Sequence, residues 1–516
     1  MAEGKDLISC RTVLWYMVFS GCAMNYMFKI NLNLVLVAIV LPKKTRASVA
    51  QCAVSNVSKI LSNVTSVPSV VASPSATPEE LEHEGRFEWN EYEQGLIIGA
   101  FYWLYWASQV PGGVLGRRYG AKKIFGGGNL LSAIICLLLP FAMKFHIVAL
   151  LLCRCFQGLI MGVMYPSIHG LPVSWVPPNE RSRFLTACLG GSVGTAVTYP
   201  LCATIIHYFN WEAAFYVSSS LGIVWFLLWS YLVYDTPHQH PRISLEELEY
   251  ISKNTPPPIV EKKKRPVPWC SILTSGPLWV TISAQWGIAW GFFTLLAQAP
   301  SYFNYIHGWS LHMTGILSGL PHLALMAFAL LIATLGDYLL RSKAMSLSAV
   351  RKLATILATG GQGLMLIGLS FSGCRPNLAV TFMILGTAMN GAMSTGTISN
   401  VVDLSPNYAG VLLGIMNLVC MATAFLSPMI VGLLTNNNQT TQQWQWVFLI
   451  AAANLMAGCI VYILFGTSEE QPWNDEAFES PEIGEELEKL KPGDGSGTGR
   501  GEKDGERRAK SIVTKE

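Results

Sequence analysis

The stretch Ile147–Leu171 reads IVALLLCRCFQGLIMGVMYPSIHGL and carries one arginine, Arg154, in an otherwise apolar run. A helix of about 20 apolar residues crosses the roughly 30 Å of hydrocarbon in a bilayer, so this stretch predicts a membrane-spanning helix. A second apolar run, Val13–Val40, carries Lys29 in the same way. A charge near the middle of a spanning helix costs about 2.5–3.5 kcal/mol, and it persists where it faces water, a partner or a substrate.

The rest of the chain repeats this apolar pattern. Of its 516 residues, 51% are apolar and 13% are charged, about half the roughly 25% charged residues of soluble domains. Only helices or closed barrels satisfy the backbone in lipid, and the lengths predict helices. We expect twelve spans, with bounds uncertain by a few residues: 13–40, 95–116, 122–143, 147–171, 184–208, 212–234, 278–303, 312–336, 352–372, 377–399, 408–434 and 444–466.

The loops divide these spans into two groups of six. The predicted fold class is an all-α membrane protein with twelve transmembrane helices in two six-helix halves, an architecture in which a central site alternates between the two faces of the membrane. The expected segments are a cytosolic N-terminus (1–12), a first half (13–234) with a long extracytoplasmic loop (42–94), a cytosolic linker (235–277), a second half (278–466) and a disordered cytosolic tail (467–516).

Charge and sequons orient the chain. Basic residues concentrate in the loops after spans 2, 4 and 8, so the positive-inside rule predicts both termini in the cytosol. Three glycosylation sequons, at Asn56, Asn63 and Asn438, then lie on the extracytoplasmic side. Cys52 and Cys374 lie on that side as well, where a disulfide between them can form. The twelve cysteines show no metal-ligand spacing, and we expect no metal.

The two buried cations predict an anion site. No acidic residue lies at a similar depth in the spans, so we expect Arg154 and Lys29 to attract a negatively charged solute. Asn33 follows Lys29 by four residues and shares its helix face. Tyr102 is a candidate lining residue. The alternatives are an Arg154 neutralised by backbone carbonyls or water, a Lys29 that reaches the interface with its long stem, and a Tyr102 that only packs.

Several blocks resemble one family. They are GVLGRRYGAK (113–122), RCFQGLIMGVMYPSIHG (154–170), WVPPNERSRF (175–184), the segment 87–113, LSGLPHLALM around His322, and LFGTSEEQPW (464–473). Together they resemble the sialin, vesicular glutamate transporter and sodium–phosphate cotransporter family of the major facilitator superfamily. The resemblance covers nearly the whole chain outside the first loop and the tail.

The resemblance implies roles for single residues. Arg154 matches a fourth-span arginine assigned to anion binding, and Lys29 stands where many relatives have arginine. His169, a candidate for ion coupling, and Asn400, a candidate for substrate binding, match family positions; packing and interhelical hydrogen bonding are the alternatives. Met161 replaces the family's fourth-span glutamate, and Ile98 and Ile288 replace a histidine and an arginine of the vesicular glutamate branch. Arg118 and Asp337 are the expected gate residues, although Arg117 replaces an aspartate of the signature.

These patterns predict a secondary transporter of small organic or inorganic anions, driven by H⁺, Na⁺ or membrane potential. We expect a monomer with no cofactor, no enzymatic activity and no nucleic-acid partner, whose partners are a small anion and the lipid bilayer. The plasma membrane and a lysosomal or vesicular membrane are both open as locations. The alternative function is a non-transporting membrane sensor or scaffold on the same fold.

Overall fold

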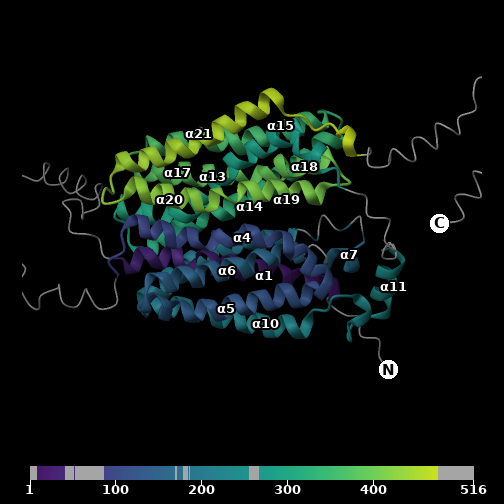
Figure 1. Ribbon diagram of the computed structural model, residues 1–516, viewed down its shortest axis with the longest axis horizontal. Coiled ribbons are helices and arrows are strands. Elements are labelled where there is room, and N and C mark those ends of the chain that lie inside the picture. The colour runs from purple at the N-terminus through teal and green to yellow at the C-terminus, as the bar shows by residue number, and fades with distance from the viewer. Residues whose placement is uncertain are drawn as a thin grey trace, which may run out of the picture.

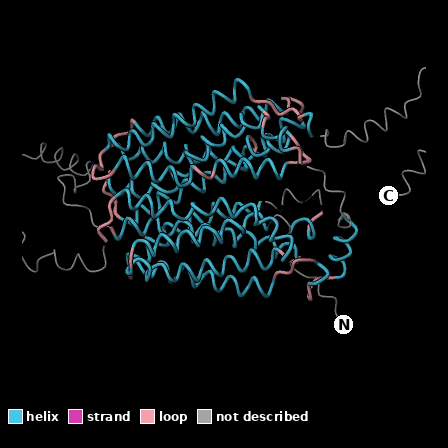
Figure 2. Tube along the Cα trace, viewed as in Figure 1, coloured by secondary structure: helices cyan, strands magenta, loops and turns pink. Residues whose placement is uncertain are grey.

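The structure is a computed structural model, and it describes residues 9–40, 52, 87–168, 171–177, 180, 184, 186–254 and 267–474. These residues are almost entirely helical, and the only bridge of extended backbone among them joins Val40 to Phe87. The long helices run side by side (Figure 2) and form two groups, an N-terminal half and a C-terminal half (Figure 1). The all-α membrane fold class predicted from the sequence is confirmed.

Six long helices form the N-terminal half. The fifth begins with a short 3₁₀ turn, Thr186–Leu189, and the glycines that follow it let this helix approach the first one closely. The six are α1 (Cys10–Ile39), α4 (Glu91–Tyr119), α5 (Ala121–Phe145), α6 (Ile147–Ile168), α9 (Gly190–Tyr208) and α10 (Trp211–Leu232).

The C-terminal half has two continuous helices, three broken ones and a last continuous one. Two of the three breaks contain a tightly packed glycine: a Cβ on Gly361 would lie 2.6 Å from the sulfur of Met389, and one on Gly391 would lie 2.5 Å from the carbonyl oxygen of Leu325. Small residues let neighbouring membrane helices approach closely. The segments are α13 (Gly276–Tyr305), α14 (Leu311–Arg341), α15 (Leu347–Ile356) with a π turn (Leu357–Gly361) and α16 (Gln362–Ser370), α17 (Pro376–Asn390) with a 3₁₀ turn (Gly391–Ser394) and α18 (Thr397–Leu404), α19 (Ala409–Cys420) with α20 (Thr423–Thr435), and α21 (Thr441–Phe465).

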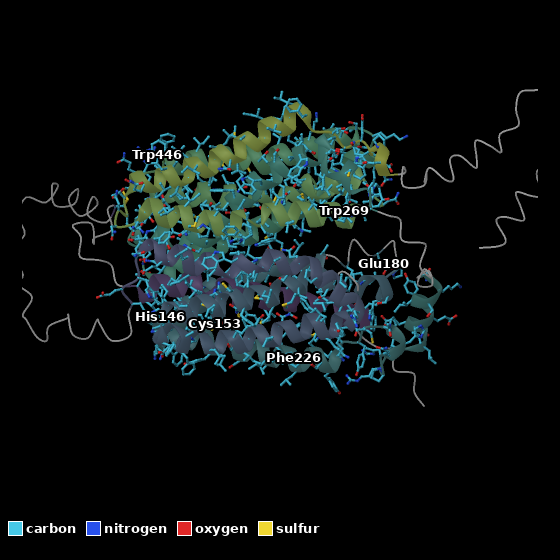
Figure 3. The ribbon with its side chains drawn as sticks, in the orientation of Figure 1. His146, Cys153, Glu180, Phe226, Trp269 and Trp446 are labelled. Atoms are coloured by element: carbon cyan, nitrogen blue, oxygen red, sulfur yellow. A yellow bond between two sulfur atoms is a disulfide. The ribbon has the colours of Figure 1, made fainter. Side chains whose placement is uncertain are left out.

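Eleven helical stretches of the described residues are long and apolar enough to cross a membrane. The helix α4 is the twelfth long one, with 29 residues, and its charged and polar side chains lower its hydropathy. Large apolar side chains such as Trp446 of α21, which is 53% exposed, lie on the outside of the bundle (Figure 3). Such an apolar surface on a folded chain fits contact with lipid.

The linker between the halves is docked on the N-terminal half. Its helix α11 (Leu245–Asn254) places Glu247 against the start of α1, where the carboxylate accepts the backbone N–H groups of Cys10 and Arg11 at 2.9 and 3.1 Å. Arg11 also bridges Glu247 and Glu180, at 3.2 and 2.9 Å. An acidic group at a helix N-terminus satisfies unpaired N–H groups and the helix dipole. We call this end of the bundle, at the right in Figure 1, the linker end.

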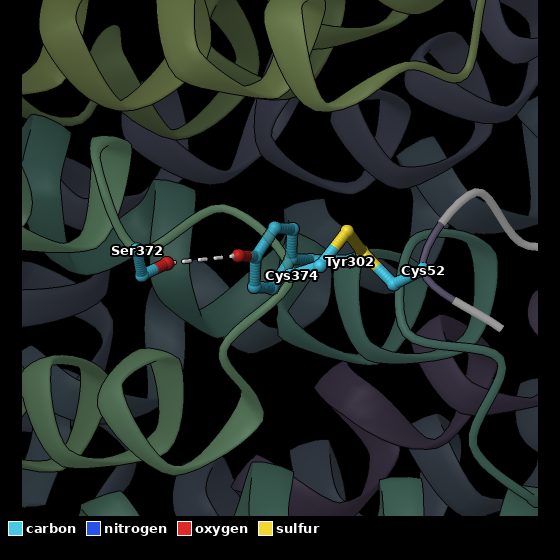
Figure 4. Close-up of a disulfide and its surroundings, with 4 residues drawn as sticks. All are labelled: Cys52, Tyr302, Ser372 and Cys374. Carbon is cyan, nitrogen blue, oxygen red and sulfur yellow. Dashed lines mark hydrogen bonds between the residues drawn. A yellow bond between two sulfur atoms is a disulfide. The ribbon is translucent and has the colours of Figure 1, made fainter. Parts of the chain in front are cut away.

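A disulfide marks the opposite end, which we call the disulfide end. Cys52, between α1 and α4, is bonded to Cys374, between α16 and α17 (Figure 4). The backbone N–H of Cys52 donates to the carbonyl of Ile306 at 3.2 Å, and nearby Tyr302 and Ser372 are joined by a hydroxyl hydrogen bond of 3.5 Å. The bond therefore ties the first loop of the N-terminal half to the C-terminal half.

The halves also meet directly at the disulfide end. A Cβ on Gly95 of α4 would lie 2.6 Å from the Pro428 carbonyl oxygen of α20, and one on Gly315 of α14 would lie 2.8 Å from the Tyr199 carbonyl oxygen of α9. Glu91, at the start of α4, accepts the backbone N–H of Asn437 at 3.0 Å. The structure thus represents a state in which the halves are closed together at the disulfide end.

We predict that the disulfide holds the two halves together after the linker is cut. A protease site inserted within residues 255–266 should give one band on a non-reducing gel and two on a reducing gel. The Cys374→Ser variant should give two bands under both conditions, because its halves share no covalent link. Two bands from the wild-type sequence without reductant would contradict the Cys52–Cys374 pairing.

Candidate functional site

Lys29 lies in an aromatic cage between the halves. Its side chain is in the middle of α1, and the residue is only 6% exposed. The ammonium faces five rings, which we call the cage; the distances from Nζ to the ring centroids are 4.8 Å for Tyr105, 5.0 Å for Tyr26, 5.1 Å for Tyr102, 5.7 Å for Phe101 and 5.9 Å for Phe293. Four rings come from α1 and α4, whereas Phe293 comes from α13 of the C-terminal half.

The cage substitutes for a counter-ion. A cation over an aromatic face gains about 0.5–1 kcal/mol when exposed and about 2 or more when desolvated. The ion pairs among the described residues belong to other cations, namely Arg11, Lys144 and Arg351. The acidic residues of the described long helices lie near helix ends: Glu91, Glu93, Glu212, Asp337 and Asp403. Lys29 is therefore buried without a carboxylate partner in the described part of the chain.

Arg154 lies behind the cage and is held by α1. It is 1% exposed; Nη1 donates to the Phe28 carbonyl at 3.3 Å and to Oε1 of Gln157 at 2.8 Å, and Nη2 donates to the Lys29 carbonyl at 3.1 Å. Its guanidinium carbon lies 4.9 Å from the centroid of Phe101, a ring that also faces Lys29. The backbone carbonyls thus occupy much of its donor capacity, which matches the structural alternative considered for this residue.

The arginine nevertheless remains a buried charge without an acid. Its Nε has no hydrogen-bond partner among the described residues. Because Arg154 binds the backbone of Lys29 and shares Phe101 with it, the two positive charges act on the same region. Two positive charges in a region of low dielectric constant favour the binding of an anion between or beside them.

The first helix carries its polar side chains into the interior. Asn25 and Asn33 are 1% and 5% exposed, and Asn25 donates to the sulfur of Met164 at 3.6 Å. On the neighbouring helix α9, the Tyr199 hydroxyl donates to the Leu296 carbonyl of the C-terminal half at 2.5 Å. The hydrogen bond of Tyr199 is thus a direct contact between α9 and α13, one helix from each half.

Comparison with known proteins fits this geometry. Residues 18–428 match the family model of the Major Facilitator Superfamily, and a second match covers 349–503. Human sialin is 37% identical over 389 residues, which cover 75% of this chain and 78% of sialin. Human vesicular glutamate transporter 2 is 34% identical over 399 residues, which cover 77% of this chain and 68% of that protein. The chain belongs to the major facilitator superfamily, in the family of sialin and the vesicular glutamate transporters. The resemblance stated from the sequence is confirmed.

Solved structures support the fold of this major facilitator protein. A bacterial homologue of the human lysosomal transporter Spinster, in an inward-facing and occupied conformation, superposes with a TM-score of 0.59 at 12% identity, over 90% of this chain and 99% of that one. A D-xylose–proton symporter superposes with a TM-score of 0.55 at 11% identity, over 86% and 97% of the two chains. At these identities the likeness concerns the fold alone.

The structure brings together some of the predicted site residues of this family member. Lys29, Arg154 and Tyr102 meet at the cage, and Asn33 is one turn of α1 away. Asn400 lies in the C-terminal half, where its Nδ2 donates to Oγ1 of Thr281 at 2.9 Å; this is the interhelical hydrogen bond considered as its alternative role.

The predicted gate residues lie outside the cage. Arg118 is exposed near the end of α4 and stacks on Tyr119, with 5.5 Å between the guanidinium carbon and the ring centroid. Asp337 is exposed near the end of α14. Asp403 instead pairs with Arg351 at 2.7 Å. A pairing of Arg118 with Asp337 stays a prediction.

Three predicted positions fall outside the described residues: His169, Asn56 and Asn63. Asn438 is exposed at the disulfide end, after α20. Within the described ranges, no three His, Cys, Asp or Glu side chains come together as a metal site. A cavity of about 240 Å³ lies away from the cage, at the disulfide end between α13, α16 and α21, where Tyr302, Trp444 and Phe448 line it.

The sequence did not reveal the other four rings of the cage. Tyr26 precedes Lys29 by three residues, a spacing that places both on one helix face, and this signal was available. Phe101 and Tyr105 flank Tyr102 in an aromatic-rich helix where packing is the ordinary interpretation. Phe293 comes from the other half, and only the folded arrangement of the halves brings it to Lys29.

Proposed function

We propose that this chain is a secondary active transporter that carries small carboxylate anions through the site between its halves. The observation that supports this most is the pair of buried cations, Lys29 and Arg154, with no carboxylate near them among the described residues. A buried unpaired charge is costly, and an anion bound there would neutralise it. Sialin and the vesicular glutamate transporters, the relatives reported above, carry names that refer to carboxylate compounds, which agrees with this proposal.

Alternation between the two faces follows from how the halves meet. The Cys52–Cys374 disulfide joins segments outside the long helices. The helices themselves meet through backbones packed at glycines and a few hydrogen bonds, such as that from Tyr199 to the Leu296 carbonyl. Such contacts can open as rigid bodies rock about the central site. The driving force is an H⁺ or Na⁺ gradient or the membrane potential, which is worth about 2.3 kcal/mol per charge per 100 mV.

The disulfide end is proposed to face the outside of the cell or the lumen of a vesicle or lysosome, with both termini in the cytosol. Disulfides persist in oxidising compartments, and Cys52–Cys374 lies at this end. The exposed sequon asparagine Asn438 lies at the same end. The basic loops predicted to be cytosolic lie at the linker end.

Flux measured with the purified protein tests the proposal. Proteoliposomes would be offered labelled glutamate, sialate and phosphate in turn, with pH, sodium and voltage gradients imposed one at a time. We expect saturable uptake of at least one carboxylate, and inhibition of that uptake by the unlabelled compound. No flux for any of these anions under any gradient, with binding retained, would favour a membrane sensor instead.

A further inference from the structure

The cage holds one side chain whose charge can change, because lysine exists either as an ammonium or as a neutral amine. Lys29 is 6% exposed, faces rings from both halves, and has no acidic neighbour in the described residues. Arginine stays protonated in proteins, so Arg154 is a fixed charge. Lysine differs from arginine in this respect, because a buried amine readily exists in a neutral form.

The groups that face Lys29 from neighbouring helices do not offer an alternative proton carrier. Those on α1 and α4 are tyrosines, which ionise near pH 10 in water and less readily when buried. The helix α6 contributes Arg154, and α9 contributes Tyr199, whose hydroxyl is already hydrogen-bonded. The helix α13 carries no charged residue between Gly276 and Tyr305. The titratable and charged groups shown against Lys29 itself are Tyr26, Tyr102, Tyr105 and Arg154; the acidic and basic residues of α4 lie near its two ends.

Two buried histidines of the C-terminal half are the other candidates for a proton carrier. His322 of α14 is 4% exposed and packs edge-on against Phe292, with 6.0 Å between ring centroids. His307 follows α13, and burial lowers its pKa to about 4. His307 therefore stays neutral in the neutral and mildly acidic range, which leaves His322 as the competitor among these two; His169, the coupling candidate named from the sequence, lies outside the described residues.

Two opposing effects act on the charge of Lys29. Removal of an amine from water disfavours its ammonium, and the nearby guanidinium repels it. The five ring faces stabilise the ammonium in place of water. A bound carboxylate adds a full opposite charge and therefore decides the balance in favour of the ammonium.

We infer that Lys29 takes up and releases the coupling proton, so that one proton crosses the membrane with each carboxylate. The inference rests on the proposed function. On the proton-rich side, the amine lone pair of Lys29 accepts a proton from water, and the resulting ammonium binds the carboxylate. On the other side the anion leaves, the ammonium returns the proton to water, and the neutral amine remains among the rings while the empty carrier reverses.

The Lys29→Arg variant separates charge from proton exchange. It keeps a cation at this position but cannot release a proton. Full-length protein in proteoliposomes would be tested with whichever of labelled glutamate or sialate the wild-type protein carries, and an internal pH dye would report proton movement. For a monovalent anion we expect wild-type accumulation of about tenfold per unit of pH gradient, without net charge movement.

For Lys29→Arg we expect slower transport that is driven by voltage and no longer by the pH gradient. Anion entry should no longer move protons, accumulation on a pH gradient should fall to about onefold, and an inside-positive voltage should drive entry instead. Proton-coupled accumulation that survives in Lys29→Arg would overturn the inference. The matched His322→Gln variant should keep proton coupling; its loss there, with retention in Lys29→Arg, would assign the proton to His322.

A cage variant keeps the inference testable if Lys29→Arg proves inactive. Phe293→Leu leaves Lys29 in place and removes one ring that stabilises the ammonium. The midpoint of the pH profile of transport should move to lower pH by about 0.5–1 unit. An unchanged midpoint would overturn the inference.

Wild-type exchange without any pH-driven accumulation would refute proton coupling and leave the proposed function intact, whereas absence of all flux would refute the proposed function itself.

Discussion

Replacement of Arg154 with alanine should lower the initial rate of anion uptake by at least about a hundredfold, which corresponds to about 2.7 kcal/mol. The guanidinium is buried, makes three hydrogen bonds to α1 and Gln157, and supplies one of the two positive charges of the site. Its removal deletes that charge and also releases the Lys29 carbonyl, so that the cage loses its support. Hydrogen bonds to charged groups contribute about 1.5–3 kcal/mol each, which makes a large effect plausible from the contacts alone.

Arg154→Lys is the matched control for this variant. It keeps the positive charge, but a single ammonium cannot reach the Phe28 and Lys29 carbonyls together with Gln157. We expect uptake between that of wild type and Arg154→Ala, near a tenfold loss. The measurement is uptake into proteoliposomes, normalised to the amount of monodisperse protein recovered in detergent. Near-normal uptake by Arg154→Ala would remove the anion site from this part of the protein.

The helical fold could be predicted because each span is decided by local composition. Runs such as Ile147–Leu171 are long and apolar, and in lipid their backbone has few alternatives to a helix. Prediction was less complete in the C-terminal half, where α15–α16, α17–α18 and α19–α20 are broken. Those breaks depend on contacts between helices, such as that of Gly391 with the Leu325 carbonyl. The sequence of one helix does not show which helix will pack against it.

The site was predicted only in its charges. A lysine and an arginine stand out in apolar helices, because an uncompensated charge in a membrane span is energetically costly. Both positions could therefore be identified from the sequence as candidates. The partners of each charge were not visible. Arg154 is bound by carbonyls of α1, which no side-chain pattern reveals, and the cage of Lys29 combines α1, α4 and α13, whose association depends on the folded state.

Gly158→Ala should destabilise the protein and disturb the cage at the same time. Gly158 of α6 packs against α4, and a Cβ there would lie 1.7 Å from the carbonyl oxygen of Phe101. Real Cβ atoms do not come this close to backbone, so α4 has to move, and overpacking of this kind costs about 1–3 kcal/mol or more. Because Phe101 and Tyr102 are cage rings, displacement of this segment also changes the surroundings of Lys29. We expect a thermal midpoint lower by several degrees and a clear loss of uptake.

Gly127→Ala is the control that isolates the clash. Gly127 lies within the neighbouring helix α5, and a Cβ there would meet nothing within 4 Å. Alanine is favoured over glycine in a helix by about 0.5–1 kcal/mol, so this variant should be as stable as the wild-type protein or slightly more so. Thermal midpoints of both variants would be measured by size-exclusion chromatography of heated detergent extracts. Equal midpoints for Gly158→Ala and Gly127→Ala would show that α4 and α6 do not pack as closely as this structure requires. The placement of the Phe101 ring near both Lys29 and Arg154 depends on that packing and would then also be wrong.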